Sequence, residues 1–109
     1  MLKKFLLAAV MVLGISMVAS AWSGYVNVTN RTGYTINYLY VSHQSSSDWE
    51  EDVLGSSVIA NGATYKVTLS NYPSPVFDIK CVDADGDSYT FRNINCQTQD
   101  VTVTLADMD

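Results

Sequence analysis

Apolar residues recur at every second position in several short runs of the chain, and turn residues separate these runs. The clearest cases are YVNVTN at 25–30, TYKVTL at 64–69 and VTVTL at 101–105. Successive side chains of a strand point to opposite faces of a sheet, so alternation places the apolar residues of each run on one face. No long run with a helical period accompanies them. The chain is therefore predicted to form sheets that bury one face.

The runs and turns together predict an all-β fold, an antiparallel β-sandwich of about seven short strands. TINYLYVSH at 35–43 is apolar or aromatic on both faces, which predicts a central strand covered on both sides. VIANGATYKVTL at 58–69 predicts a short strand, an Asn-Gly turn and a second strand. The acidic segment 44–56 breaks the pattern. Ser47 followed by Glu50 has capping-box spacing and predicts one short helical turn in this acidic loop.

The first 21 residues have the features of a secretory signal peptide. Lys3 and Lys4 precede an apolar run at 5–18, and Ala19-Ser20-Ala21 supplies the small residues that a signal peptidase requires. The apolar run is shorter than the ~20 residues of a membrane-spanning helix. We therefore expect residues 1–21 to be removed, residues 22–109 to form one β-sandwich domain, and the protein to be periplasmic or extracellular.

The charge of the chain excludes some classes of partner. The net charge is −5, and removal of Lys3 and Lys4 with the signal peptide makes it more negative still. Nucleic acids and anionic lipid surfaces repel such a surface, so neither is expected as a partner. A protein or a carbohydrate remains as the expected class of partner.

The stretch DADGDSY at 83–89 predicts the tip of a hairpin between two strands. A two-residue turn would pair charged residues with core residues on both faces. A three-residue loop instead pairs Ile79 with Phe91 and brings the odd-numbered apolar residues onto one face. The longer loop also places Gly86 where the backbone requires a positive φ, so this register is preferred.

The same stretch carries three carboxylates, and two interpretations of them remain open. Asp and Gly are ordinary turn residues, so the hairpin can be explained without any ligand. Alternatively, the loop contributes to a calcium site at one end of the sandwich. The spacing is not that of an EF-hand, and calcium takes about six to eight oxygen ligands, so a second loop would have to contribute. The candidate calcium ligands are Asp83, Asp85 and Asp87, joined by Asp48 and Asp52 from the other acidic loop.

Two cysteines, Cys81 and Cys96, form a candidate disulfide because an exported chain meets an oxidising compartment. The preferred register argues against simple pairing. Cys81 lies opposite Tyr89, and Cys96 lies about 23 Å further along a straight strand. Cα atoms across a disulfide tolerate only about 6 Å, so the chain would have to turn back. A buried free thiol at Cys81 is the other possibility.

No catalytic constellation is evident in the sequence, so an enzyme is not expected. His43 is the single histidine, and the serines near it lack the surroundings of a nucleophile elbow. Zinc sites draw on several histidine or cysteine ligands, so a zinc site is not expected. Trp49 in the acidic loop is either a plug that pins the loop to the sandwich or a contact for a partner.

The runs VNVTNRTGYTINYLYVS, SDWEEDVLGSSVIANGATYKVTL and FDIKCVDADGDSYTFRNI together resemble a family of small exported bacterial domains. The shared pattern is N-x-T-G, L-Y-V-S, W-x-x-D-x-L, N-G and a D-x-D-G-D-x-Y hairpin. The resemblance implies bacterial export and a β-sandwich fold, with no established activity. Within it Trp49, Asp52, Gly62 and residues 83–89 fit the pattern.

The sequence therefore predicts an exported binding or interaction module. In one form the acidic end loops bind calcium and assist recognition. In the other the protein is a metal-free structural or protein-contact module of the envelope or the medium. Calcium is the only cofactor that the residues suggest.

Overall fold

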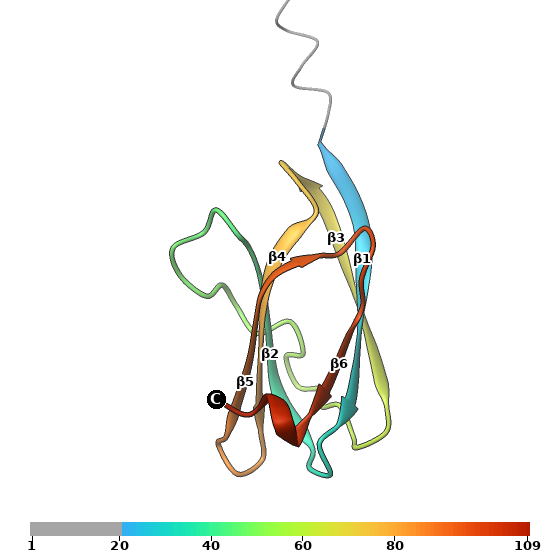
Figure 1. Ribbon diagram of the computed structural model, residues 1–109, viewed down its shortest axis with the longest axis vertical. Coiled ribbons are helices and arrows are strands. Elements are labelled where there is room, and N and C mark those ends of the chain that lie inside the picture. Colours follow the sequence, from blue (N-terminus) through green and yellow to red (C-terminus); the bar gives the residue numbers. More distant parts are fainter. Residues whose placement is uncertain (1–20) are drawn as a thin grey trace, which may run out of the picture.

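The computed structural model describes residues 21–109, which form six strands in two facing sheets (Figure 1). The signal peptide predicted for residues 1–21 lies almost entirely outside the described residues. Within the described part of the chain, no helix has the length and apolarity needed to cross a membrane. The strands are β1 (Trp22–Arg31), β2 (Ile36–His43), β3 (Thr64–Tyr72), β4 (Val76–Asp83), β5 (Ser88–Asn95) and β6 (Val101–Thr104), followed by the 3₁₀ turn η3 (Leu105–Asp107).

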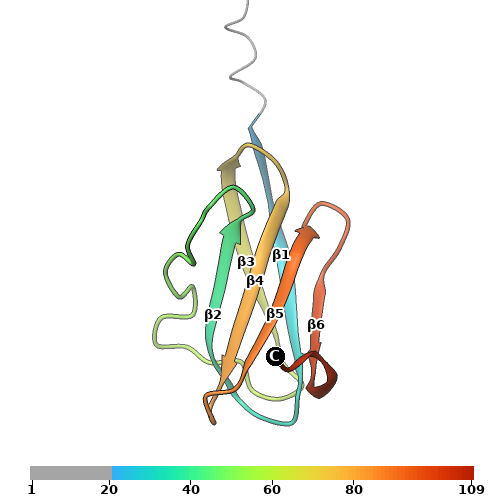
Figure 2. The ribbon, with the colours of Figure 1, turned by 60° about the vertical axis from the view of Figure 1, so that its left-hand side comes forward.

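The strand order confirms the predicted all-β sandwich, with three differences in detail. β2, predicted as a central strand covered on both sides, is an edge strand, and Tyr38 on its outer face is 47% exposed. One sheet has the order β3-β1-β6 and the other β2-β4-β5, and Figure 2 shows the latter three strands side by side. All pairs are antiparallel except β1 with β6, which is parallel. The strand predicted near 58–60 is reduced to one bridge between Ile36 and Ile59, because only this short segment reaches β2 before the Gly62 turn.

The core lies between the two sheets and is built from the alternating residues. Each strand contributes its inward side chains, and the connection between β2 and β3 adds Leu54 and Ile59. The polar exceptions are also ordered. Asn30 is fully buried, and its side-chain amide donates to the carbonyl oxygens of Tyr34 and Ile59 while its oxygen accepts from Thr32. This amide network closes the β1–β2 turn over the core.

The hairpin between β4 and β5 has the predicted register. Ile79 pairs with Phe91 and Cys81 pairs with Tyr89, so the odd-numbered apolar residues share the inner face. Gly86 has φ of 85°, a conformation that residues with a Cβ rarely adopt. The predicted three-residue loop is therefore confirmed.

The acidic loop after β2 contains no helical turn, so that prediction is wrong. The loop leaves the end of β2 and returns along its edge, where Asp52 forms a bridge with Tyr40 (Figure 2). The Ser42 hydroxyl accepts a hydrogen bond from the Glu50 backbone N–H, and the Val53 N–H donates to the Leu39 carbonyl. These bonds to β2 hold the loop backbone extended. They also satisfy backbone N–H groups of the loop that would otherwise bond within a helical turn.

Candidate functional site

Asp83 closes the β4–β5 hairpin as a buried hydrogen-bond acceptor. Its side chain is 2% exposed. One carboxylate oxygen accepts the backbone N–H groups of Asp85 at 2.9 Å and Asp87 at 3.0 Å. The other oxygen accepts the hydroxyl of Tyr89 at 2.8 Å. Asp83 therefore holds the loop closed and keeps three donors satisfied.

Tyr89 lies in the core directly beneath the loop and is fully buried. Burial, the hydrogen bond to Asp83 and the negative charges of Asp83 and Asp87 raise the pKa of Tyr89 to about 12. The phenol consequently stays protonated and donates to Asp83 throughout the neutral range.

Asp85 and Asp87 are exposed on the loop and complete a small acidic cluster. One carboxylate oxygen from each of Asp83, Asp85 and Asp87 lies within 4.8 Å of the others. Three oxygens at this separation fit part of a calcium shell, which takes about six to eight. Two of the three side chains are solvated, so water can also balance their repulsion.

The second acidic loop does not join this cluster, contrary to the expectation of a shared site. Asp48 lies near Ser42 and Asp78, which pair with each other toward the far end of the sheet. Asp78 is five positions before Asp83 on β4, which corresponds to about 16 Å along the strand. The two loops leave opposite ends of the sheet, because one follows β2 and the other joins β4 to β5.

Asp52 has a structural role like that of Asp83. One carboxylate oxygen accepts the backbone N–H of Leu39 at 2.8 Å and that of Leu54 at 3.0 Å. The side chain is half-buried against the edge of β2. Asp52 therefore anchors the returning loop. It does not lie in the cluster of Asp83, Asp85 and Asp87, although it was predicted to join them as a calcium ligand.

Trp49 lies over the outer face of the β2-β4-β5 sheet rather than in the core. Its ring is 6.4 Å from the ring of Tyr40, and the guanidinium of Arg92 lies 5.0 Å from the indole centroid. The side chain is half-buried by these contacts. Trp49 thus pins the loop to the sheet from outside and leaves part of its ring accessible.

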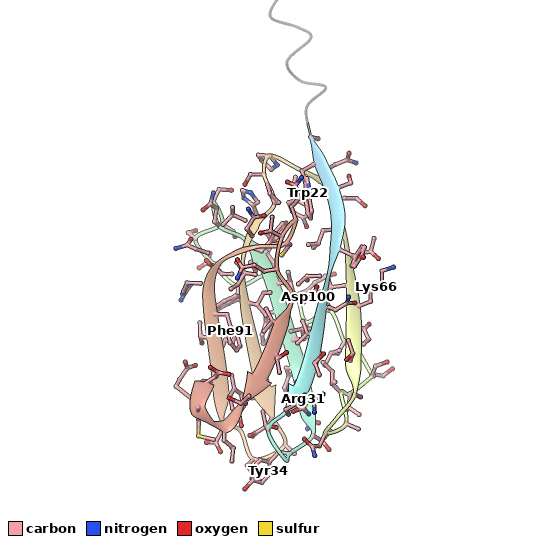
Figure 3. The ribbon with its side chains drawn as sticks, turned by 45° about the vertical axis from the view of Figure 1, so that its right-hand side comes forward. Trp22, Arg31, Tyr34, Lys66, Phe91 and Asp100 are labelled. Atoms are coloured by element: carbon pink, nitrogen blue, oxygen red, sulfur yellow. The ribbon has the colours of Figure 1, made fainter. Side chains whose placement is uncertain are left out.

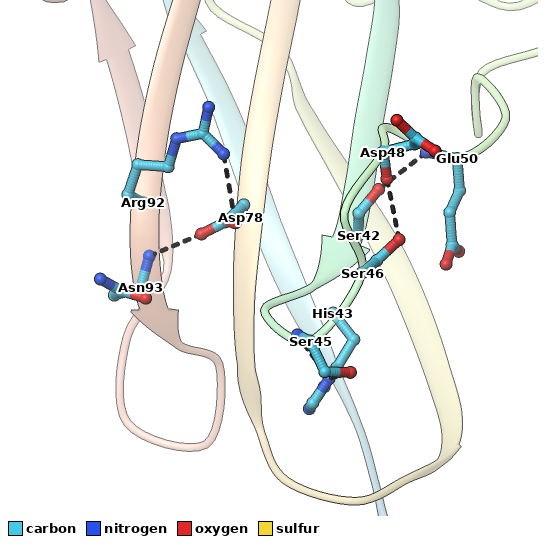
Figure 4. A network of polar contacts seen from close by, with 9 residues as sticks. All are labelled: Ser42, His43, Ser45, Ser46, Asp48, Glu50, Asp78, Arg92 and Asn93. Carbon is cyan, nitrogen blue, oxygen red and sulfur yellow. Dashed lines mark hydrogen bonds and ion pairs between the residues drawn. The ribbon is translucent and has the colours of Figure 1, made fainter.

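Arg92 is itself positioned by Asp78 through a bulge in β5 (Figure 4). The Asp78 carboxylate accepts the Asn93 backbone N–H at 2.9 Å and contacts the Arg92 guanidinium at 3.3 Å. Asn93 has φ of 57°, which marks the irregular position. The result is a polar pocket of about 140 Å³ lined by Ser42, Ser46, Ser47, Asp48, Trp49, Asp78 and Arg92.

Sequence reasoning named Trp49 but did not place Tyr40, Asp78 or Arg92 beside it. The residues are distant in sequence, and each belongs to a different strand. Alternation indicates that Tyr40 points outward, because Leu39 and Val41 point inward, but it does not indicate which loop covers it.

His43 is buried between two loops, and both ring nitrogens contact hydroxyl groups. Nδ1 lies 2.8 Å from the Ser45 hydroxyl and also accepts the Ser45 backbone N–H, whereas Nε2 lies 2.9 Å from the Ser74 hydroxyl. Within residues 21–109, no carboxylate hydrogen-bonds to the ring. The ring also stacks on Tyr72 at 5.9 Å, so His43 joins the 71–75 loop to the end of β2.

The candidate disulfide is not formed. Cys81 and Cys96 are both free and buried. The Cys96 backbone N–H donates to Pro75, just before β4 begins, and Cys81 lies six positions further along. That separation is about 20 Å along the strand, well beyond disulfide reach. Burial raises the pKa of Cys81 to about 12 and, with the charge of Asp100, that of Cys96 to about 11.

Comparison of the chain with protein-family models, with curated proteins and with solved structures gives no match.

Proposed function

We propose that the protein is an exported interaction module that binds a partner protein through the outer face of the β2-β4-β5 sheet. The observation that carries the proposal is the fixed position of Trp49 between Tyr40 and Arg92. A core residue would point inward, whereas this indole is held on the outside by a folded loop and an ion-paired arginine.

The composition of this face favours a protein partner over a small molecule. Trp, Tyr and Arg are the side chains that most often dominate binding energy at protein interfaces. Tyr38, two positions before Tyr40, is 47% exposed and extends the aromatic surface along β2. The adjoining pocket of about 140 Å³ is smaller than the ~300–1,000 Å³ of typical small-molecule sites.

Export is the part of the proposal that rests on the first 21 residues. Their basic start, apolar run and small-residue end are typical of a cleaved leader. Fusion of residues 1–21 to a reporter enzyme that is active only outside the cytoplasm tests it. Activity that is lost when Lys3, Lys4 and the apolar run are deleted supports export, and activity without them contradicts it.

Site-specific photocrosslinking in the source cell tests the binding face. A photoreactive residue at Tyr38 should give one discrete protein adduct, and Trp49→Ala should abolish it while circular dichroism shows an unchanged fold. The matched control is Tyr34, which is 44% exposed in the β1–β2 turn at the far end of the molecule. Equal adducts from both positions, or an adduct that survives Trp49→Ala, would contradict the proposal.

A second candidate function is calcium-assisted recognition through the hairpin, favoured by the three carboxylates within 4.8 Å. The matched variant is the double substitution Asp85→Asn and Asp87→Asn, because it spares the structural Asp83. Thermal unfolding is measured in EDTA, in millimolar calcium and in millimolar magnesium.

The two candidates differ in the expected result. A calcium site at 100 times its dissociation constant adds about 2.7 kcal/mol, and the double variant should lose that gain. If the midpoint of thermal unfolding is the same in all three solutions, the hairpin does not bind calcium. The outer face would then remain as the candidate binding surface.

A further inference from the structure

The first half of β1 has an open edge on the side where β6 would lie. β6 pairs with β1 only from Val28 to Arg31, so the six residues before Val28 have no strand beside them there. The chain enters β6 through residues 96–100, which belong to no strand, and the Asp100 side chain is bonded to β1. Between them lies a cleft of about 450 Å³ lined by Trp22, Ser23, Gly24, Tyr25, Cys96, Gln97, Thr98, Gln99 and Asp100.

Backbone groups of β1 point into this cleft. The Asn27 N–H donates to the Asp100 carboxylate at 2.9 Å, so the N–H of Asn27 faces away from β3. The register between β1 and β3 is regular from Gly24 to Thr29. Hydrogen-bonding direction alternates along a strand, so the N–H and C=O of Tyr25 also face the cleft. Among residues 21–109, no strand pairs with them.

The walls of the cleft are already ordered. The Trp22 ring lies 6.1 Å from Phe77 and covers Gly24, where a Cβ would come within 2.5 Å of the indole. On the other side the Gln99 side-chain oxygen accepts the Asn95 backbone N–H at 3.1 Å. Figure 3 shows Trp22 near the start of β1 and Asp100 further along, just before β6. A ligand would therefore meet a formed slot, which lowers the cost of ordering.

The charge of the residues that line the cleft indicates which peptides it can bind. Asp100 is the single charged side chain of the lining. The Lys66 ammonium lies 4.4 Å from the centroid of the Tyr25 ring, and the expected cleavage places an α-amino group at Trp22, so a cationic group is favoured only at the Asp100 end of the cleft. The chain as a whole carries −5, so a basic segment is attracted and an acidic one repelled.

We propose that the open edge of β1 beside Tyr25 accepts an extended peptide carrying a basic residue, which adds as a strand in line with β6. The peptide backbone would bond to the N–H and C=O of Tyr25, and its basic side chain would face Asp100. Because Asp100 already holds the Asn27 N–H, the free edge is residues 22–26, about 17 Å of strand, which a peptide of about six residues covers. This site is on the other sheet from Trp49 and does not depend on the proposed function.

A matched pair of variants at one position isolates the backbone contribution. Tyr25→Pro removes the N–H that faces the cleft, while Tyr25→Val removes the same ring and keeps that N–H. The bonds to β3 are unaffected in either case, because they come from the neighbouring residues. Circular dichroism checks that both variants fold.

The probe is a set of capped hexapeptides of alternating valine and threonine with one lysine moved through each position. A second set carries glutamate in its place. Binding is followed by the chemical shift and hydrogen exchange of the Tyr25 amide in the protein. The lysine set should slow exchange of this amide, and Asp100→Asn should weaken binding several-fold. Tyr25→Pro should weaken binding at least tenfold relative to Tyr25→Val, measured by fluorescence anisotropy.

Three results would overturn the inference. The first is no protection of the Tyr25 amide by any lysine peptide at millimolar concentration. The second is equal binding of the lysine and glutamate sets. The third is an unchanged Tyr25 amide in the wild-type protein when a peptide does bind, a readout that stands even if Tyr25→Pro fails to fold.

Discussion

The two acidic loops of this protein are alike in composition and in one structural device. Each contains one aspartate whose carboxylate accepts two backbone N–H groups: Asp83 in the hairpin, and Asp52 in the loop after β2. The remaining acidic residues, including Asp48 and Asp85, are exposed. A segment rich in carboxylates can therefore contain one aspartate that accepts structural hydrogen bonds beside others that are only solvated. The number of acidic residues does not show which of them has the structural role.

The loops differ in how deeply their structural aspartate is placed. Asp83 is buried and also accepts the hydroxyl of a core tyrosine, whereas Asp52 is half-buried at the edge of β2. Water can reach the donors around Asp52 more readily if the carboxylate is removed. The same device should therefore contribute more to stability in the hairpin than in the longer loop.

The largest effect is expected for Asp83→Ala. This change leaves the buried Tyr89 hydroxyl without an acceptor and frees two loop N–H groups, so it should lower the free energy of unfolding by about 3 kcal/mol. Urea denaturation followed by circular dichroism measures it. A loss no larger than that of Asp85→Ala would mean that the hairpin does not depend on this carboxylate.

Asp52→Ala should cost about 1.5 kcal/mol, because the N–H groups of Leu39 and Leu54 lose a charged acceptor but gain access to water. The same denaturation experiment applies, with Glu51→Ala as the exposed neighbour for control. If Asp52→Ala cost more than Asp83→Ala, burial would not be what distinguishes the two loops.

Tyr89→Phe tests the third hydrogen bond of Asp83 and should cost about 1 kcal/mol near neutral pH. The pKa of Tyr89 is raised from 10.0 to about 12 in the fold, so the unfolded chain loses this proton first. The contribution is fully present below pH 10 and is lost as the pH rises from 10 to 12. Wild-type stability should fall over that range more steeply than the stability of Tyr89→Phe, and parallel curves would contradict the assignment.

The smallest effects are expected for the exposed carboxylates. Asp85→Asn in the hairpin and Asp48→Asn in the loop should each change the free energy of unfolding by less than about 0.5 kcal/mol in EDTA. Relief of repulsion at Asp85 would give a slight gain that high salt removes. A loss of more than about 1 kcal/mol in the free energy of unfolding at either position would show that this carboxylate makes a stabilising contact, contrary to its exposed position.

The hairpin was the part of the molecule that the sequence predicted best, because its contacts are local. Alternation and the need for positive φ at Gly86 set one register. The same alternation places Asp83 on the inner face with Ile79 and Cys81, so its burial was also available from the pattern. The calcium hypothesis counted Asp83 among the ligands and did not use that signal.

The loop after β2 could not be predicted, because distant residues determine its shape. Its backbone is bonded to Ser42 and Leu39 of β2, and Trp49 is held by Arg92 from β5. The Ser47–Glu50 spacing favours a helical turn only in the absence of such contacts. The same limit applies to the disulfide, because cysteine number predicts a pairing only where the fold brings the two residues together.

The parallel pairing of β1 with β6 has a consequence for the order in which the protein can fold. β1 is made before β6, and Val28 is 73 positions before its partner Val101. Contacts so distant along the chain raise contact order and slow folding. The β3-β1-β6 sheet thus cannot be completed until the ribosome has added the 73 residues that separate Val28 from Val101, so β1 stays without this partner during that time.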